Sequence, residues 1–190
     1  ACGDGQTDDT RAFQRALAGR TEFVTGARAE DNLWTWRKEM YRLVDRLTPE
    51  AYEAVAALVY LEMLQFGMTG VCEFHYVHHA PGGRPYAQRT VMAECVINAA
   101  LAAGIRITLL RTVYLRAGFQ QALAPGQDRF VDRDVDEALA DTLTLHTRYA
   151  GHPRVRIGIA PHSIRAVPIA QVTAVAEFAR SHGLPCHMHI

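Results

Sequence analysis

Apolar residues recur along the chain with two different spacings, which predict an alternation of helices and strands. Apolar residues three or four positions apart predict helices over residues 31–47, 51–66, 88–103, 131–149 and 168–182. Continuous short apolar runs predict strands over residues 70–76, 105–110, 155–160 and 184–190. Thr48 followed by Pro49 is typical of an N-cap and a first helical residue, which supports the start of the second helix.

The repeated order of strand, loop and helix predicts an α/β fold with parallel strands joined by crossover helices. The strands are apolar throughout, as expected when both faces of a sheet are covered. Two architectures fit this order, the open doubly wound sheet and the (β/α)8 barrel. No GxGxxG motif follows a strand, which weakens the nucleotide-binding version of the open sheet, and the histidines favour the barrel. Six histidines fall at or just past strand ends, the face where barrel enzymes assemble their sites: His75, His78, His79, His162, His187 and His189. Because barrels usually need about 250 residues, we expect an incomplete barrel of roughly five strands.

Composition and charge narrow the classes of partner. The 20 basic and 20 acidic residues balance, which disfavours a nucleic-acid-binding protein with a basic face. The chain has neither an apolar run long enough for a membrane span nor a signal-like N-terminus. The four cysteines have no CxxC spacing and are interpreted as reduced thiols. We therefore expect a cytoplasmic protein with no nucleic-acid or membrane partner.

Two histidines lie near the end of the chain, at His187 and His189. In a strand both imidazoles face the same side, so they could bind a metal in the mouth of a barrel. Core histidines with ordinary hydrogen-bond partners are an equally good interpretation.

A polar cluster ends the strand that begins at Gly70. The hydroxyl of Tyr76 is expected either to point into a site or to belong to a core residue. His78 and His79 are expected to be loop residues in solvent.

An imidazole and a guanidinium follow the strand over residues 155–160, at His162 and Arg165. An arginine offers two parallel donors to a carboxylate, so this pair suits recognition of a carboxylate. The alternative is a surface arginine paired with a neighbouring helix. Arg37 is interpreted either as a second anion contact or as a solvated residue.

Five motifs in this order resemble the formimidoylglutamate deiminase family of the amidohydrolase superfamily. They cover residues 12–190 and consist of 12-AFQRALAG-19, 34-WTWR-37, 73-EFHYVHH-79, 160-APHSIRAV-167 and 187-HMH-189. The resemblance implies a metal-dependent (β/α)8 barrel, usually containing zinc. Such an enzyme hydrolyses N-formimino-L-glutamate, an intermediate of histidine degradation, to N-formyl-L-glutamate and ammonia.

The resemblance also implies roles for single residues. His189 matches the metal ligand supplied by the fifth strand of the family's barrel. The positions that hold the substrate, with the arginines on its carboxylates, match Gln14, Arg37, Tyr76, His162 and Arg165. The expected partner is this small molecule. A homodimer is one assembly that the sequence allows.

The chain departs from the family pattern at both ends. Asp9 and Arg11 occupy the places of the family's first-strand histidine pair, and a guanidinium cannot replace a histidine ligand. The family's catalytic glutamate and the residues of strands six to eight would lie beyond Ile190. We therefore expect an atypical segment over residues 1–11 and an incomplete barrel domain over residues 12–190, which is inactive by itself.

Other interpretations remain open. The first fifteen residues also resemble the entry motif of pectate-lyase-like β-helices, which we take as coincidental because the rest of the chain has long helical patterns. The chain could instead belong to an amidohydrolase deaminase that acts on a nucleobase-like substrate. It could also be a non-catalytic remnant that binds dicarboxylates.

Overall fold

The computed structural model describes residues 33–119, 121–123 and 126–190, with side chains from residue 40 onward. The described helices are α3 (Leu33–Arg46), α4 (Pro49–Gln65), α5 (Val91–Ala103), α6 (Val135–Arg148) and α7 (Ile169–Ser181). The described strands are β1 (Gly70–His75), β2 (Arg106–Val113) and β3 (Val155–Pro161). Within this part of the chain no helix is both long and apolar enough for a membrane span.

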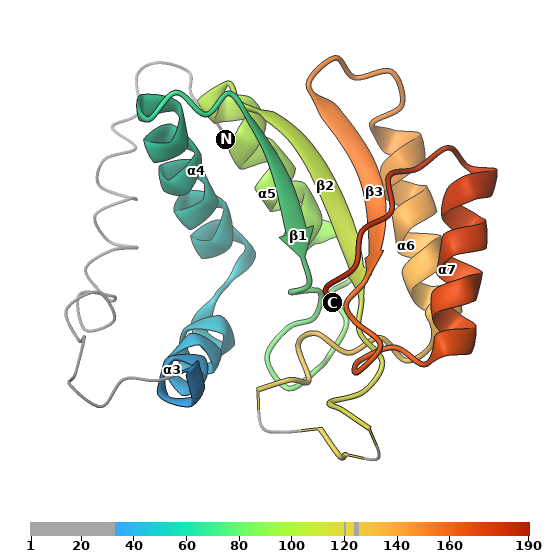
Figure 1. Cartoon of the computed structure of the whole chain (residues 1–190). Helices are drawn as coiled ribbons and strands as arrows, with labels where there is room; N and C mark the ends of the chain where they lie inside the picture. The colour runs from blue at the N-terminus through green and yellow to red at the C-terminus, as the bar shows by residue number, and fades with distance from the viewer. Residues whose placement is uncertain (1–32, 120, 124–125) are drawn as a thin grey trace.

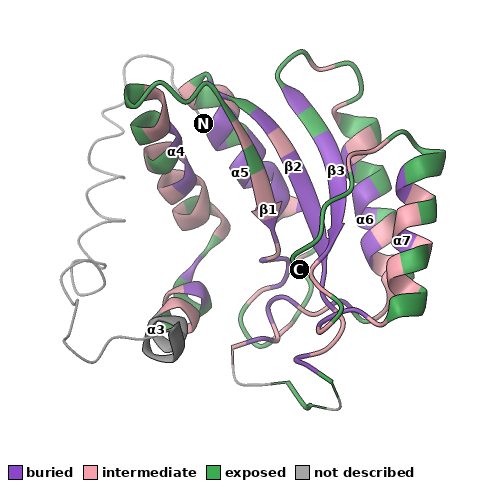
Figure 2. Ribbon diagram, in the orientation of Figure 1, coloured by how far each residue is buried: buried purple, intermediate pink, exposed green. Residues whose placement is uncertain are grey.

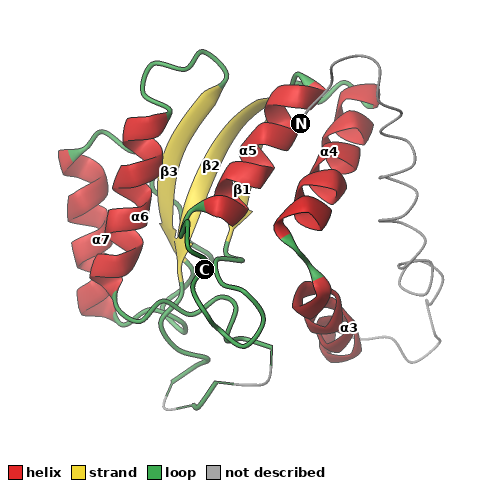
Figure 3. Cartoon of the chain, turned by 180° about the vertical axis from the view of Figure 1, so that it is seen from behind, coloured by secondary structure: helices red, strands yellow, loops and turns green. Residues whose placement is uncertain are grey.

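The three strands form one parallel sheet in the order β1-β2-β3 (Figure 1). Gly70 of β1 is in register with Arg106 of β2, and Ile107 of β2 is in register with Val155 of β3. Helices follow the strands in the chain and pack beside them, as the view from behind shows (Figure 3). This arrangement confirms the predicted α/β class with parallel strands and crossover helices.

Alternation along β2 assigns its side chains to two faces of the sheet. Ile107 and Leu109 are buried in a cluster that also contains Tyr60 of α4 and Ile97 of α5. Residues at the intervening positions, such as Thr108, point to the opposite face. The buried residues of β2 and β3 form the centre of the molecule (Figure 2).

The N-terminus of α4 is built as the sequence predicted. The hydroxyl oxygen of Thr48 accepts a hydrogen bond from the backbone N–H of Ala51 at 3.2 Å, and Pro49 is the first helical residue. Thr48 thereby satisfies one of the N–H groups that a helix start leaves without a partner.

Two predicted helices begin later than expected. The helix predicted over residues 88–103 begins at Val91, because a turn precedes it and Arg89 in that turn reaches an aspartate of α6. The helix predicted over residues 131–149 begins at Val135. Asp134 is its N-cap and accepts a hydrogen bond from the backbone N–H of Glu137 at 2.8 Å.

Two predicted strands have different limits. The strand predicted over residues 105–110 continues to Val113 as β2, because the charge of Arg111 is neutralised inside the protein. The segment over residues 184–190 forms a single parallel bridge, between Cys186 and Ile159, rather than a strand. It nevertheless runs beside β3, since the N–H of Ile159 donates to the carbonyl of Pro185 at 2.9 Å.

Candidate active site

His162, the first residue after β3, lies among four aromatic rings. Its ring centroid is 4.9 Å from that of Tyr114, 5.2 Å from His189, 5.8 Å from Phe74 and 5.9 Å from Tyr76. All four rings meet that of His162 at steep angles, between 73° and 89°. The structure therefore brings together three of the predicted site residues, Tyr76, His162 and His189.

Strand periodicity and backbone hydrogen bonds position these side chains. Phe74 and Tyr76 are two residues apart at the end of β1, so their rings lie on the same side of the sheet. The backbone N–H of His162 donates to the carbonyl of Val113 at 3.0 Å, which continues the pairing of β3 with β2. The N–H of His189 donates to the carbonyl of His162 at 3.1 Å. The last residues of the chain are thereby held beside the end of β3.

Phe74 packs against His189 with ring centroids 4.2 Å apart. His189 is exposed, whereas His162 and Tyr76 are half-buried. His187 is exposed as well, and its backbone N–H donates to the carbonyl of Ile159 at 3.2 Å. The site thus consists of aromatic rings packed around the half-buried imidazole of His162, beside the solvent-exposed imidazole of His189.

Arg165 links the loop after β3 to the loop after β2. Its Nη1 donates to the backbone carbonyl of Ala117. In the opposite direction, the guanidinium of Arg116 donates to the carbonyls of Ile164 and Arg165, both at 3.0 Å. The backbone N–H groups of Leu115 and Arg116 donate to the carbonyl of Ala166 at 3.0 and 3.1 Å.

The resemblance assigns Arg37 and Arg165 to the substrate, together with His162 and Tyr76. The contact of Arg165 described above is with the backbone of a neighbouring loop, and its role toward an anion stays a prediction. The side chain of Arg37 lies outside the described residues, although its backbone belongs to α3. Gln14 lies outside the described residues altogether, as do Asp9 and Arg11.

The expectation that His78 and His79 are solvent-exposed is wrong. Both are buried, with 5% and 6% of their surface exposed. The Nε2 of His78 donates to the carbonyl of Thr112 and that of His79 to the carbonyl of Val131, each at 2.9 Å. Burial, together with the positive charge of Arg111, holds the pKa of His78 well below its ordinary value. Each imidazole thus ties its own loop to a backbone carbonyl far along the chain, that of Thr112 in β2 for His78 and that of Val131 for His79.

A buried ion-pair network joins β2 to α6, and it was not predicted from the sequence. Arg111 of β2 donates to both carboxylate oxygens of Asp132, at 2.6 and 2.8 Å, and to Asp141 of α6 at 2.8 Å. Arg89 donates to Asp141 at 2.9 and 3.0 Å. Burial alone lowers the pKa of Arg111, but the two carboxylates outweigh it and raise the pKa, so the guanidinium stays charged.

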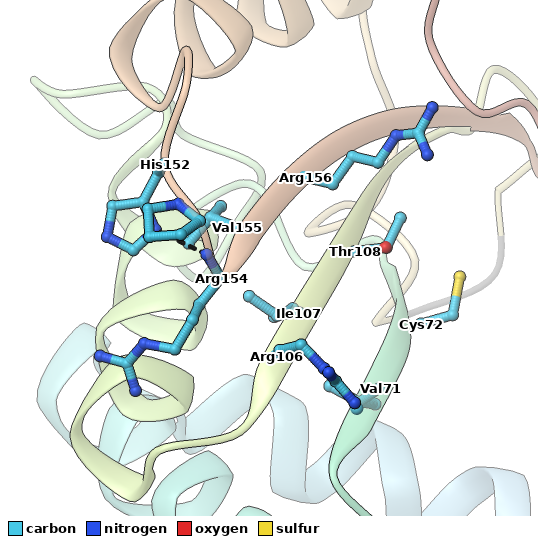
Figure 4. Close-up of a pocket in the computed structure, with 11 residues that line it drawn as sticks. Val71, Cys72, Arg106, Ile107, Thr108, His152, Arg154, Val155 and Arg156 are labelled. Carbon is cyan, nitrogen blue, oxygen red and sulfur yellow. Dashed lines mark hydrogen bonds between the residues drawn. The ribbon is translucent and has the colours of Figure 1, made fainter.

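A hollow of about 600 Å³ opens at the other end of the sheet (Figure 4). It is lined by the first residues of the three strands and by three arginines, Arg106, Arg154 and Arg156. None of the predicted site residues whose side chains the structure describes lines it. The hollow is thus separate from the aromatic cluster around His162, which lies where the strands end.

The profile that describes the amidohydrolase family matches residues 18–190. This chain belongs to the amidohydrolase family. The assignment agrees with the parallel α/β fold and with the position of the aromatic cluster at the carboxyl ends of the strands.

Relatives of this amidohydrolase differ in the substrate that their names state. The chain is 44% identical over 183 residues to the formimidoylglutamate deiminase of Pseudomonas aeruginosa, covering 95% of this chain and 39% of that protein. It is 30% identical over 169 residues to a 5-methylthioadenosine/S-adenosylhomocysteine deaminase of Desulfovibrio desulfuricans, covering 88% of this chain and 32% of that protein. The resemblance stated from the motifs is therefore confirmed at the level of the family.

Two solved structures share the fold. An amidohydrolase from Brucella melitensis superimposes with a TM-score of 0.77 at 37% identity, over 94% of this chain and 39% of that one. Atrazine chlorohydrolase TrzN from Arthrobacter aurescens TC1, solved as a complex with zinc, matches with a TM-score of 0.61 at 22% identity, over 95% of this chain and 35% of that one. The chain thus spans 39% and 35% of the length of these two proteins, and its sheet corresponds to part of their fold.

The described residues do not complete a metal site. Among them, no three His, Cys, Asp or Glu side chains come together in a way that could hold a metal ion. His189 is the described residue that the resemblance assigns to the metal, and its imidazole is a suitable zinc ligand. The described part of the chain therefore offers one proposed ligand and not a full set.

Sequence reasoning missed Tyr114, whose ring centroid is the nearest of the four to that of His162. The apolar run predicts a strand that ends at Leu110, which leaves Tyr114 outside the predicted strand end. Continuing the alternation from Thr108 through Leu110 and Thr112 places residue 114 on the same face. That signal was present in the sequence.

Proposed function

We propose that this amidohydrolase is part of an enzyme that hydrolyses the formimino group of N-formimino-L-glutamate, giving N-formyl-L-glutamate and ammonia. The observation that carries the proposal is the 44% identity to a protein named formimidoylglutamate deiminase. The cluster of Tyr76, His162 and His189 supports it, because these are residues that the motifs assign to substrate and metal. A cytoplasmic location is proposed with it. The described cysteines are free, which agrees with a reducing compartment.

In this proposal the described residues bind and orient the substrate. His162 and Tyr76 offer a ring N–H and a phenolic hydroxyl to polar atoms of N-formimino-L-glutamate. Arg165 supplies a charge-assisted hydrogen bond to a carboxylate of the substrate, and Arg37 and Gln14 complete its binding. The surrounding aromatic rings lower the local dielectric around the half-buried imidazole and so strengthen such bonds.

One divalent metal, zinc, is proposed as the cofactor, with His189 as a ligand. Because the described residues do not complete its coordination, the remaining ligands are proposed to lie elsewhere in the enzyme. The chemistry assigned here to the described residues is therefore binding of the substrate. The general acid or base of the reaction is not assigned to any of them.

The proposal is tested by ammonia release in the whole protein that contains this chain. The substrates are N-formimino-L-glutamate, 5′-methylthioadenosine and a dicarboxylate without a formimino group, each with added zinc. Release from N-formimino-L-glutamate alone is the expected result. Release from the nucleoside alone would support the nucleobase-like alternative, to which the 30% identical deaminase belongs by name. Binding of dicarboxylates without any turnover would support the non-catalytic alternative.

Residues 1–190 by themselves are proposed to lack turnover, since they span 39% of the length of the 44% identical relative. The same assay and a zinc analysis are applied to this polypeptide beside the whole protein. Ammonia release at ordinary enzyme rates, on the order of 1–10³ per second, would show that the catalytic groups lie within these residues.

Replacing Arg165 with alanine is expected to weaken N-formimino-L-glutamate binding by at least about tenfold in the whole protein. The variant loses the proposed hydrogen bond to a carboxylate of the substrate, whereas the parallel pairing of β2 and β3 is kept. KM and kcat are measured beside Arg180→Ala, a matched change of an exposed arginine in the last turn of α7. If the two variants have the same kinetic constants, Arg165 does not contact the substrate.

A further inference from the structure

Tyr114, the residue that follows β2, is held at three points. Its backbone N–H donates to Oδ2 of Asp132 at 3.2 Å, and its carbonyl accepts from the N–H of Asp132 at 2.8 Å. Its hydroxyl oxygen accepts a hydrogen bond from Nε2 of Gln127 at 3.0 Å. The residue is 2% exposed and Gln127 is fully buried. The main chain and the far end of the ring are therefore both fixed.

The fixed ring meets His162 nearly at a right angle. The two ring centroids are 4.9 Å apart and the planes are inclined by 82°. This edge-to-face geometry is a favourable one for aromatic pairs. On its other sides His162 meets Tyr76, and its Nδ1 lies 3.1 Å from the hydroxyl of Ser163. A rotation of the imidazole would break the contact with Tyr114.

The two residues that hold Tyr114 make further hydrogen bonds of their own. Asp132, which holds its backbone, is itself bound by Arg111 in the buried ion-pair network. Gln127, which holds its hydroxyl, also donates to the hydroxyl of Tyr41 in α3 at 3.4 Å. Side chains that fix a group at a site in this way reduce the loss of freedom when a ligand binds.

We propose that Tyr114 is a positioning residue, which fixes the imidazole of His162 for contact with the substrate and is itself held by Gln127. The inference rests on the proposed function, because it takes His162 as a residue that binds the substrate. It adds two residues that neither the motifs nor the names of the relatives assign.

The kinetic test compares Tyr114→Leu, Tyr114→Phe and Gln127→Leu in the whole protein. Tyr114→Leu removes the ring beside His162 and is expected to raise KM for N-formimino-L-glutamate by about tenfold, with a smaller change in kcat. Tyr114→Phe keeps the ring and loses only the bond to Gln127, so about threefold or less is expected. Gln127→Leu is expected to match Tyr114→Phe.

The matched control is Tyr60→Phe. Tyr60 is also a buried tyrosine, and its hydroxyl donates to Oε2 of Glu73 at 2.8 Å on the helix-covered side of the sheet. This variant loses a buried hydrogen bond away from His162, and its KM is expected to equal that of the parent. A KM in Tyr114→Leu equal to that of Tyr60→Phe would overturn the proposal.

A second readout does not depend on the reaction. The ring signals of His162 are assigned in a ¹⁵N-histidine-labelled protein by comparison with His162→Gln. They are expected to broaden in Tyr114→Leu, because the imidazole is no longer held in one orientation, and to keep the parent's line width in Tyr60→Phe. Unchanged His162 signals in Tyr114→Leu would overturn the proposal. Changed signals in a protein that does not hydrolyse N-formimino-L-glutamate would leave the positioning role intact and contradict the proposed function alone.

Discussion

Replacing Arg111 with methionine is expected to lower the free energy of unfolding by about 3–5 kcal/mol. The side chains of Arg111, Asp132 and Asp141 are 2%, 0% and 8% exposed. Methionine fills a similar volume but leaves two buried carboxylates without their shared guanidinium. Removing one partner of a buried ion pair is costly for this reason, even where the intact pair contributes little net stability.

The change in stability is measured by denaturant unfolding at neutral pH. The matched control is Arg133→Met, which removes an ion pair with Asp134 where the arginine side chain is 80% exposed. Solvent screens that pair, so little change is expected. Equal unfolding midpoints for the two variants would show that the buried carboxylates find other partners or bind protons.

Acidification from pH 6.5 towards pH 3 is expected to destabilise the protein through His75. This imidazole is 1% exposed, and burial, followed by the charge of Arg111, lowers its pKa to about 3. The unfolded chain binds a proton at this histidine below about pH 6.5, whereas the folded chain does not until about pH 3. Each pH unit in this window therefore favours the unfolded chain by up to about 1.4 kcal/mol.

The contribution of His75 is isolated by its substitution. His75→Gln is expected to show a shallower loss of stability between pH 6.5 and pH 3 than the parent protein, because glutamine binds no proton. His146→Gln, the same change at a half-buried histidine in α6, is the control substitution. His78 contributes in the same direction as His75, since its pKa is lowered as well. Parallel pH profiles for the parent and His75→Gln would contradict the prediction.

Most of the fold was predictable because its signals are local. The N-cap at Thr48 and the apolar runs of β1 and β3 depend on neighbouring residues, and the structure confirms them. The errors arise where a residue has a distant partner. Arg111 marked the end of an apolar run in the sequence, but Asp132 and Asp141, which lie 21 and 30 residues further along the chain, let it stay inside β2.

The candidate site was predictable to a similar extent. Strand-end positions and motif resemblance identified Tyr76, His162 and His189, which the structure places together. The burial of His78 and His79 was not predictable, because the carbonyl that each imidazole reaches belongs to a residue 34 or 52 positions away. Tyr114 was missed together with the last three residues of β2.

The hydrogen bonds between the loops after β2 and β3 have a consequence for redesign of substrate preference. Leu115 and Arg116 share the carbonyl of Ala166, while Arg165 binds back to Ala117. Exchanging one loop with that of a relative would leave these donors facing a backbone of different shape. Grafts that transfer both loops together keep these hydrogen bonds within the transplanted residues. A change of substrate preference in this protein is therefore expected to require the exchange of both loops.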